Sequence, residues 1–112
     1  MSAAAALGKD FECSIVEAHH SAKKDAPSGT AIALQKVIRE AVPESEQPEI
    51  TSFREGEVVG FHEVIFESQA DRIYLSHDAK SRRGFAEGAV QAAEWLAGKT
   101  GFYDFRDIWR EL

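Results

Sequence analysis

Two adjacent histidines and a nearby lysine are the residues of this chain best suited to chemistry. His19 and His20 follow a strand-like run, and Lys23 comes three residues later. Histidine titrates near neutral pH and suits general acid–base catalysis, and lysine adds a second proton source and a positive charge. Because adjacent residues leaving a strand point to opposite faces, one histidine can face a substrate while the other braces the loop. We therefore expect proton transfer in this loop.

The segment after this loop has the composition of an anion-binding helix start. Ser28 is a typical N-cap residue, and Gly29 lets a ligand approach the backbone closely. The free N–H groups of a helix N-terminus, together with the Thr30 hydroxyl, suit a carboxylate. Taken alone, Ser-Gly-Thr also suits an ordinary capped helix. Its position beside two histidines and a lysine favours a binding site.

The net charge of the chain is −6, yet its basic residues form two local clusters. The first is Lys23 and Lys24, and the second is Lys80, Arg82 and Arg83. An acidic chain with two local basic clusters indicates a small anionic ligand and argues against nucleic-acid binding. Arg82 falls at the start of a predicted helix, where its charge opposes the helix dipole. A two-pronged contact to a carboxylate is the natural use for this arginine. The alternative is a pair of solvated loops.

Metal binding is a competing use of the same histidines. The possible ligands are His19, His20, Asp25, His62 and His77. No His-x-x-x-His or Cys pair occurs, and adjacent histidines seldom ligate one ion, so we expect no metal. We interpret His62 as a strand surface residue and His77 as a weaker candidate for the site.

Length and composition indicate one soluble domain over residues 1–112. Apolar residues make up 44% and charged residues 29%, which is typical of a globular protein. No apolar run is long enough to span a bilayer, and the Ala-rich start lacks the basic region of a signal peptide. Cys13 is the only cysteine and is interpreted as a small core residue. We therefore expect a cytoplasmic protein without membrane contact.

Hydrophobic periodicity predicts three helices and four strands. Helices are expected over residues 3–7, 30–41 and 81–98, and strands over 11–18, 49–54, 58–67 and 71–77. Short links between the last three strands favour antiparallel pairing of neighbours. This order predicts an α+β fold: a mixed sheet of about four strands with helices mainly on one face. The other sheet face then needs a cover, which self-association would supply.

The loop and helix start resemble the signature of a known enzyme family. The matching residues are Glu17-Ala18-His19-His20, Lys23 and Asp25-Ala26-Pro27-Ser28-Gly29-Thr30-Ala31. Further similarity lies in Arg54-Glu55-Gly56, Val59-Gly60 with His62, Ser76-His77 through Ser81-Arg82, Phe85-Ala86 with Gly88-Ala89, and Gly101-Phe102-Tyr103-Asp104-Phe105. These segments resemble the C-terminal domain of 4-hydroxy-tetrahydrodipicolinate reductase (dihydrodipicolinate reductase), an enzyme of lysine (diaminopimelate) biosynthesis, over nearly the whole chain.

The resemblance implies a role for each matching residue. His19 matches the proton donor/acceptor and Lys23 the proton donor of the family. The positions that match substrate-binding residues are His20, Gly29, Thr30 and Arg82. The resemblance also implies a cyclic dicarboxylate substrate, NADPH or NADH as hydride donor, a homotetramer built through the sheet, and no metal.

The chain departs from the family pattern in two ways. Ser21 and Ala22 stand where the family usually has arginine and histidine, which removes positive charge near the site. No glycine-rich phosphate loop of the G-x-G-x-x-G type occurs, so the family's Rossmann domain is absent from these residues. We expect residues 1–9 and 102–112 to pack toward that missing cofactor domain. The alternative to a reductase half is a free-standing oligomerisation or dicarboxylate-binding module without catalysis.

Overall fold

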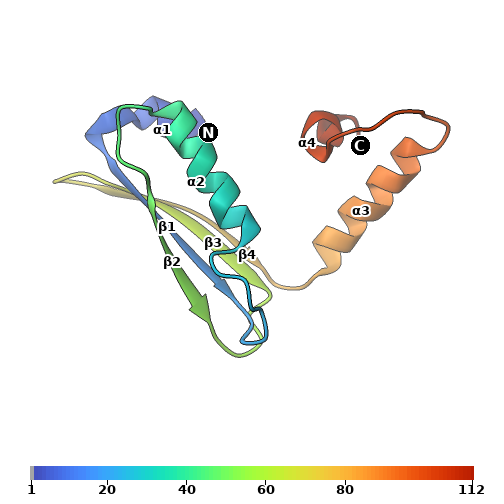
Figure 1. Ribbon diagram of the computed structural model, residues 1–112, viewed down its shortest axis with the longest axis horizontal. Helices are drawn as coiled ribbons and strands as arrows, with labels where there is room; N and C mark the ends of the chain where they lie inside the picture. The colour runs from blue at the N-terminus through green and yellow to red at the C-terminus, as the bar shows by residue number, and fades with distance from the viewer. Residues whose placement is uncertain (1) are drawn as a thin grey trace. The chain divides into compact units, whose positions relative to one another are not determined.

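The computed structural model describes residues 2–112. The chain forms two compact units, and the boundary along the sequence lies between Lys80 and Ser81. The first unit contains α1 (Ser2–Leu7), a short 3-10 helix (Gly8–Asp10), β1 (Glu12–His19), α2 (Gly29–Ala41), β2 (Glu49–Arg54), β3 (Gly60–Glu67) and β4 (Arg72–Ala79). The second contains α3 (Arg83–Leu96), α4 (Phe105–Ile108) and a final 3-10 turn (Trp109–Glu111). Figure 1 labels these elements.

The sheet is mixed, and its strand order is β2-β1-β3-β4. β1 pairs in parallel with β2 and antiparallel with β3, which pairs antiparallel with β4. The predicted four-stranded mixed α+β sheet is confirmed. The expected hairpin between the second and third strands is wrong, because β1 lies between β2 and β3 despite their short link. The strand-helix-strand unit β1-α2-β2 explains this, since a connection through a helix allows parallel pairing.

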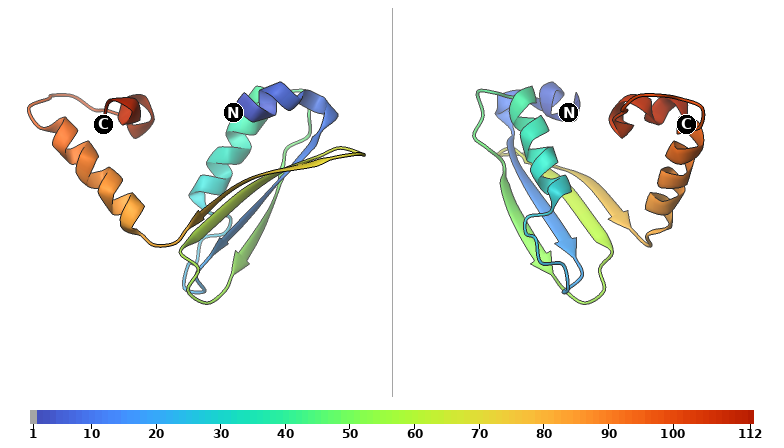
Figure 2. Two further views of the ribbon diagram at one scale, coloured as in Figure 1. Left: turned by 180° about the vertical axis from the view of Figure 1, so that it is seen from behind. Right: turned by 45° about the vertical axis from the view of Figure 1, so that its right-hand side comes forward.

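One face of the sheet is covered by α2, as two further views show (Figure 2). The core lies between this face and the helix. Ile15 of β1 is fully buried, and Val64 and Phe66 of β3 lie beside it on the same face. Ala31 and Ile38 of α2 pack onto them, and the Ser28 cap starts this helix. Odd-numbered residues of β1 therefore face α2. This parity also directs Glu17 and His19 toward the helix side.

The helix α1 packs against the same core through Ala4, which is almost fully buried. The start of the described chain therefore packs on the core that α2 and the sheet form.

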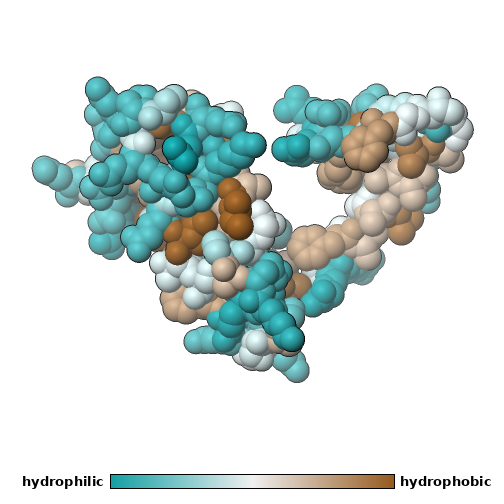
Figure 3. Space-filling view, viewed as in Figure 1, coloured by the Kyte–Doolittle hydropathy of each residue, from teal (hydrophilic) through white to brown (hydrophobic). Residues whose placement is uncertain are grey.

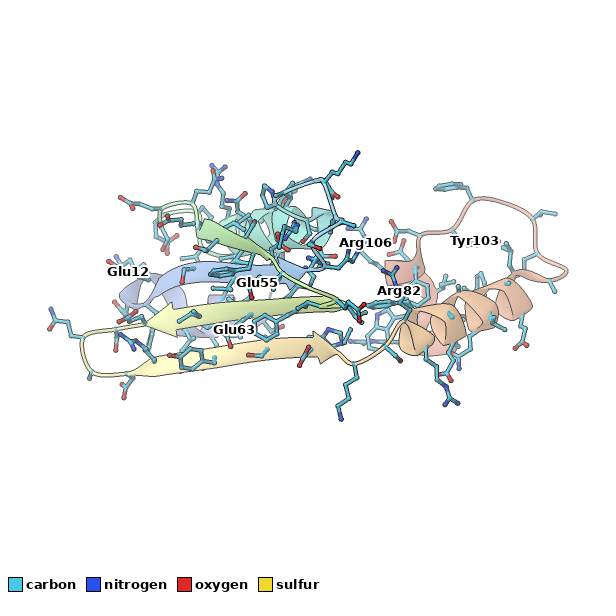
Figure 4. The ribbon with its side chains drawn as sticks, turned by 90° about the horizontal axis from the view of Figure 1, so that it is seen from below. Glu12, Glu55, Glu63, Arg82, Tyr103 and Arg106 are labelled. Atoms are coloured by element: carbon cyan, nitrogen blue, oxygen red, sulfur yellow. The ribbon has the colours of Figure 1, made fainter. Side chains whose placement is uncertain are left out.

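The second unit is a helix with an aromatic segment that turns back on it. The Trp95 and Tyr103 rings meet edge to face with centroids 5.0 Å apart, and the Tyr103 hydroxyl donates to the Thr100 carbonyl. Asp104 caps α4, and Ile108 is buried. Arg82 lies at the start of α3 (Figure 4). The expected stop of this helix near Gly98 agrees with its end at Leu96, and Gly98 has positive φ.

Several large apolar side chains of the first unit remain exposed. Ile32 and Val37 of α2 are exposed. On the face turned to the viewer, Figure 3 shows apolar side chains among hydrophilic ones. Phe53 and Tyr74 lie on the sheet face away from α2 and are 46% and 54% exposed. Within residues 2–112, no helix is both long and apolar enough to cross a membrane.

Candidate functional site

A buried carboxylate beneath the first histidine is the centre of the candidate site. Glu17 and His19 are two residues apart on β1, so both side chains face α2. Glu17 lies opposite His62 in β3, and His19 lies opposite Arg54 in β2. Three neighbouring strands therefore deliver ionisable side chains to one place.

Glu17 is 0% exposed and accepts hydrogen bonds from three directions. Arg54 donates to both carboxylate oxygens, at 3.0 Å from one terminal nitrogen and 2.8 Å from the other. The Nδ1 atom of His19 lies 2.5 Å from Oε2, and the backbone N–H of Ser28 donates to Oε1 at 3.3 Å. A charge removed from water needs such partners, and here every one is a donor.

These partners decide the charge of Glu17. Burial alone would raise the pKa of its carboxyl. Hydrogen bonds from Arg54, Ser52 and His19, with the positive charge of Arg54, outweigh burial and lower that pKa to about 2. Glu17 is therefore a carboxylate at neutral pH, placed to support a proton on the neighbouring imidazole.

Ser28 links the helix start to the histidines. Its hydroxyl accepts from the Ala31 N–H, as an N-cap does, and lies 2.9 Å from Nε2 of His62. The His62 ring meets the His19 ring edge to face, with centroids 5.1 Å apart. Burial, followed by the nearby His19, lowers the pKa of His62, so that ring stays neutral.

The interpretation of His62 as a surface residue is wrong, because His62 is half-buried beside His19. Sequence parity gives a usable signal here: His62 lies two and four residues before Val64 and Phe66, which form the core face of the same strand. His77 lies opposite His62 in β4 but is exposed.

The loop between β1 and α2 is tied to the turn after β2. The Ser21 N–H donates to the Gly56 carbonyl and the Glu55 N–H donates to the His19 carbonyl. Within the loop, Lys23 forms an ion pair with Asp25 at 3.0 Å and keeps a quarter of its side chain exposed. A hydrogen bond from Lys23 lowers the pKa of Asp25. The Lys23 side chain therefore lies at the solvent side of the loop.

The helix start is open to solvent. Gly29 and Thr30 are exposed, and a Cβ added to Gly29 would meet nothing within 4 Å. Space for a ligand therefore exists next to the first N–H groups of α2. His20, half-buried, begins the loop that leads there.

The structure thus places five of the six predicted site residues in the first unit, on the end of β1, its following loop and the start of α2. Arg82 belongs to the second unit and is exposed there. Sequence reasoning from residue types missed Glu17 and Arg54 as part of the site. Both residues were named only as parts of the segments that resemble the family.

The geometry also bears on metal binding. Ligand atoms of Glu17, His19 and His62 lie within 4.8 Å of one another. A cation there would have to displace the guanidinium of Arg54, which already contacts both Glu17 oxygens. The arrangement therefore suits proton sharing better than metal binding.

Comparison with known proteins gives one consistent result. The family model described as "Dihydrodipicolinate reductase, C-terminus" matches residues 1–109. Curated relatives named 4-hydroxy-tetrahydrodipicolinate reductase include those of Magnetococcus marinus and Zymomonas mobilis. Each is 43% identical, over 94% and 95% of this chain and 46% and 49% of the relative. The chain therefore spans about half the length of these relatives.

A solved structure has a similar fold. It is a dipicolinate-bound dihydrodipicolinate reductase from Paenisporosarcina sp. TG-14, with a TM-score of 0.72 and 24% sequence identity. The similarity covers 94% of this chain and 48% of that one.

Proposed function

Because this chain belongs to the dihydrodipicolinate reductase family and matches its C-terminal part, we propose that it is the substrate-binding and proton-donating domain of an NAD(P)H-dependent 4-hydroxy-tetrahydrodipicolinate reductase. The observation that supports this most is the juxtaposition of the His19–Glu17 pair with an open helix N-terminus. Such a site can supply a proton and bind a carboxylate within one loop. The reaction would belong to lysine (diaminopimelate) biosynthesis.

Two residues would handle protons. Reduction of an unsaturated ring adds one hydride and one proton, and NADPH or NADH supplies the hydride when bound. His19, supported by the Glu17 carboxylate, would exchange a proton with the substrate. Before the reduction the ring hydroxyl leaves as water: Lys23, partly exposed, would give that hydroxyl its proton, and His19 would take the ring proton that is lost and return it after hydride transfer.

Substrate binding would use the groups around the start of α2. The N–H groups of Gly29 and Thr30 and the Thr30 hydroxyl would accept one carboxylate. His20 would contact the same ligand from the loop. For Arg82 we propose a two-pronged carboxylate contact, because its position matches a substrate-binding arginine of the family. The structural relative is bound to dipicolinate, which supports a dicarboxylate substrate of this kind.

We assign no residue between 2 and 112 to nucleotide binding. Residues 2–112 contain no glycine-rich phosphate loop, so we assign NADPH or NADH to the part of the relatives that this chain does not span. The expected packing of residues 1–9 and 102–112 against that part belongs to the same proposal.

A direct test is calorimetric titration of the chain with pyridine-2,6-dicarboxylate, a planar dicarboxylate. Saturable binding that the His20→Ala/Thr30→Ala variant abolishes would support a substrate site formed by this domain. A folded chain that binds nothing would favour the alternative function, a module for assembly alone.

The sheet face away from α2 supports a role in assembly as well. Phe53, Ala18 and Phe61 lie side by side across three strands on that face, and Phe53 is 46% exposed. A second copy of the chain is the natural cover for such a sheet surface, and the proposed assembly is a homotetramer.

A further inference from the structure

The Arg54 side chain has no role in the function proposed above, yet it is among the most tightly bound side chains of the first unit. It is 16% exposed, and its guanidinium contacts both oxygens of Glu17. The same group donates to the Asp25 carbonyl at 2.7 Å and the Phe53 carbonyl at 2.8 Å. A surface ion pair would not be fixed in this way, because exposed pairs contribute little and remain mobile.

These bonds hold the Glu17 carboxylate in one orientation. Arg54 approaches from β2, the Ser28 N–H from the start of α2, and His19 from the end of β1. Two of the three are strand or helix positions with fixed backbones. The carboxylate is therefore preorganised before any ligand arrives.

The His19 ring is fixed along both edges. Its Nδ1 atom faces Glu17, and its opposite edge lies over Gly60, where a Cβ would sit 3.4 Å from Nε2 and 3.6 Å from Cδ2. The His62 ring packs against it edge to face. Only Nε2 is left without a protein acceptor or donor among the contacts of the residues described.

We propose that Glu17, clamped by Arg54, is the positioning residue that holds neutral His19 as its Nδ1–H tautomer and so makes Nε2 the atom that exchanges the proton. This inference rests on the proposed function only for the identity of the proton acceptor. When Nε2 gains a proton, both ring nitrogens carry hydrogen and the positive charge lies against the Glu17 carboxylate. When Nε2 gives the proton up, the Nδ1–H bond to Glu17 remains.

The other charged and titratable groups around the ring agree with this assignment. Arg54 faces it from β2, and His62 faces it from β3 with His77 on the next strand. A neutral His62 adds no competing charge, and Arg54 balances Glu17. The Glu17 carboxylate thus favours a proton on Nδ1 of His19.

The tautomer is measurable in the 112-residue chain by two-bond nitrogen–proton correlation NMR of the imidazole rings. We expect the neutral form of His19 to show the Nδ1–H pattern. The Glu17→Met/Arg54→Met variant removes the carboxylate without leaving a buried charge unpaired. In that variant we expect the Nε2–H pattern to become the major one.

The matched control is Glu67→Met/Arg72→Met, which removes an exposed carboxylate–guanidinium pair with a 3.0 Å contact on β3 and β4. It should leave the His19 pattern unchanged. An Nε2–H pattern in the wild-type chain would overturn the proposal, and so would an unchanged pattern in the Glu17→Met/Arg54→Met variant. Should that variant fail to fold, the wild-type measurement alone still decides.

The dicarboxylate titration separates this inference from the proposed function. An Nδ1–H pattern in a chain that binds no pyridine-2,6-dicarboxylate would contradict the substrate site and leave the positioning of His19 intact. Binding of the dicarboxylate by a chain with an Nε2–H pattern would support the substrate site and overturn the positioning of His19.

Discussion

At the scale of single residues, the chemistry of this domain depends on a carboxylate that never reaches solvent. Glu17 is fully buried, yet hydrogen bonds from Arg54, Ser52 and His19 and the charge of Arg54 keep it ionised. Because removal of one partner would leave the other charge buried and unpaired, this cluster is sensitive to single substitutions. The same atoms therefore stabilise the domain and hold His19 in position for proton exchange.

Acid should destabilise the domain through Glu17. Its pKa is lowered from 4.5 to about 2, so the folded state binds this proton less tightly than the unfolded chain. The stabilisation is complete above the unfolded pKa and is lost as pH falls toward 2; it amounts to about 3 kcal/mol. We expect urea unfolding between pH 6 and pH 2.5 to show this loss.

The Glu17→Gln variant should be less stable than wild type at pH 7 and should lose stability less steeply below pH 4.5. Glu67→Gln, at an exposed ion pair, is the control and should follow the wild-type curve. A Glu17→Gln curve parallel to wild type would show that other carboxyls carry the acid sensitivity.

Lys23 should matter for turnover and not for folding. Its ion pair with Asp25 is partly exposed, so Lys23→Ala should change the free energy of unfolding by no more than about 0.5–1 kcal/mol. In a reductase completed by a nucleotide-binding domain, the same change should reduce kcat by roughly 100-fold or more. Unfolding of the Lys23→Ala chain under native conditions would rule out a solvent-facing role for this lysine.

At the scale of elements, the start of α2 connects the core with the site. Ser28 caps the helix through Ala31, donates its own N–H to Glu17 and contacts His62 with its hydroxyl. A capping serine ordinarily contributes about 1 kcal/mol. Here the same hydroxyl also satisfies a half-buried histidine.

Ser28→Ala should therefore lower the free energy of unfolding by about 1–2 kcal/mol, as measured by urea denaturation. Ser81→Ala provides the comparison, because Ser81 also accepts a backbone N–H at a helix start but is exposed. We expect a change below about 0.5 kcal/mol for that variant. Equal losses in the two variants would mean that the contact with His62 contributes nothing.

Sequence patterns predicted the elements well and their pairing less well. The helix predicted over 30–41 and the strand predicted over 49–54 follow from local periodicity, and the structure has them at 29–41 and 49–54. The insertion of β1 between β2 and β3 does not, because strand order depends on contacts between distant segments.

The site divides in the same way. The loop from His19 to Thr30 is continuous in sequence and was predicted from residue types and the family signature. Arg54 and His62 reach the site through strand register, 37 and 45 positions after Glu17. Local parity places His62 on the core face of its strand but does not show which residues lie opposite it.

At the scale of the whole molecule, the helices of the first unit cover only one face of its sheet. Tyr74 on that face is 54% exposed, and Phe53 is 46% exposed. If self-association covers this face, Phe53→Lys should shift the chain toward monomer in sedimentation velocity at micromolar concentration, because a buried unpaired charge is costly. Ile32→Lys, on the outer side of α2, should leave the sedimentation profile unchanged. A wild-type chain that is already monomeric would contradict the assembly proposal.

The bond from the Ser28 backbone to Glu17 has a consequence for exchange with solvent. The Ser28 amide hydrogen is held by a buried carboxylate, whereas the next two residues, Gly29 and Thr30, are exposed. Deuterium should therefore replace the Ser28 hydrogen only when the carboxylate cluster opens, and its protection factor measures how often that happens. Exchange at this one amide therefore reports how often the site opens, and its measurement needs no substrate, cofactor or mutation.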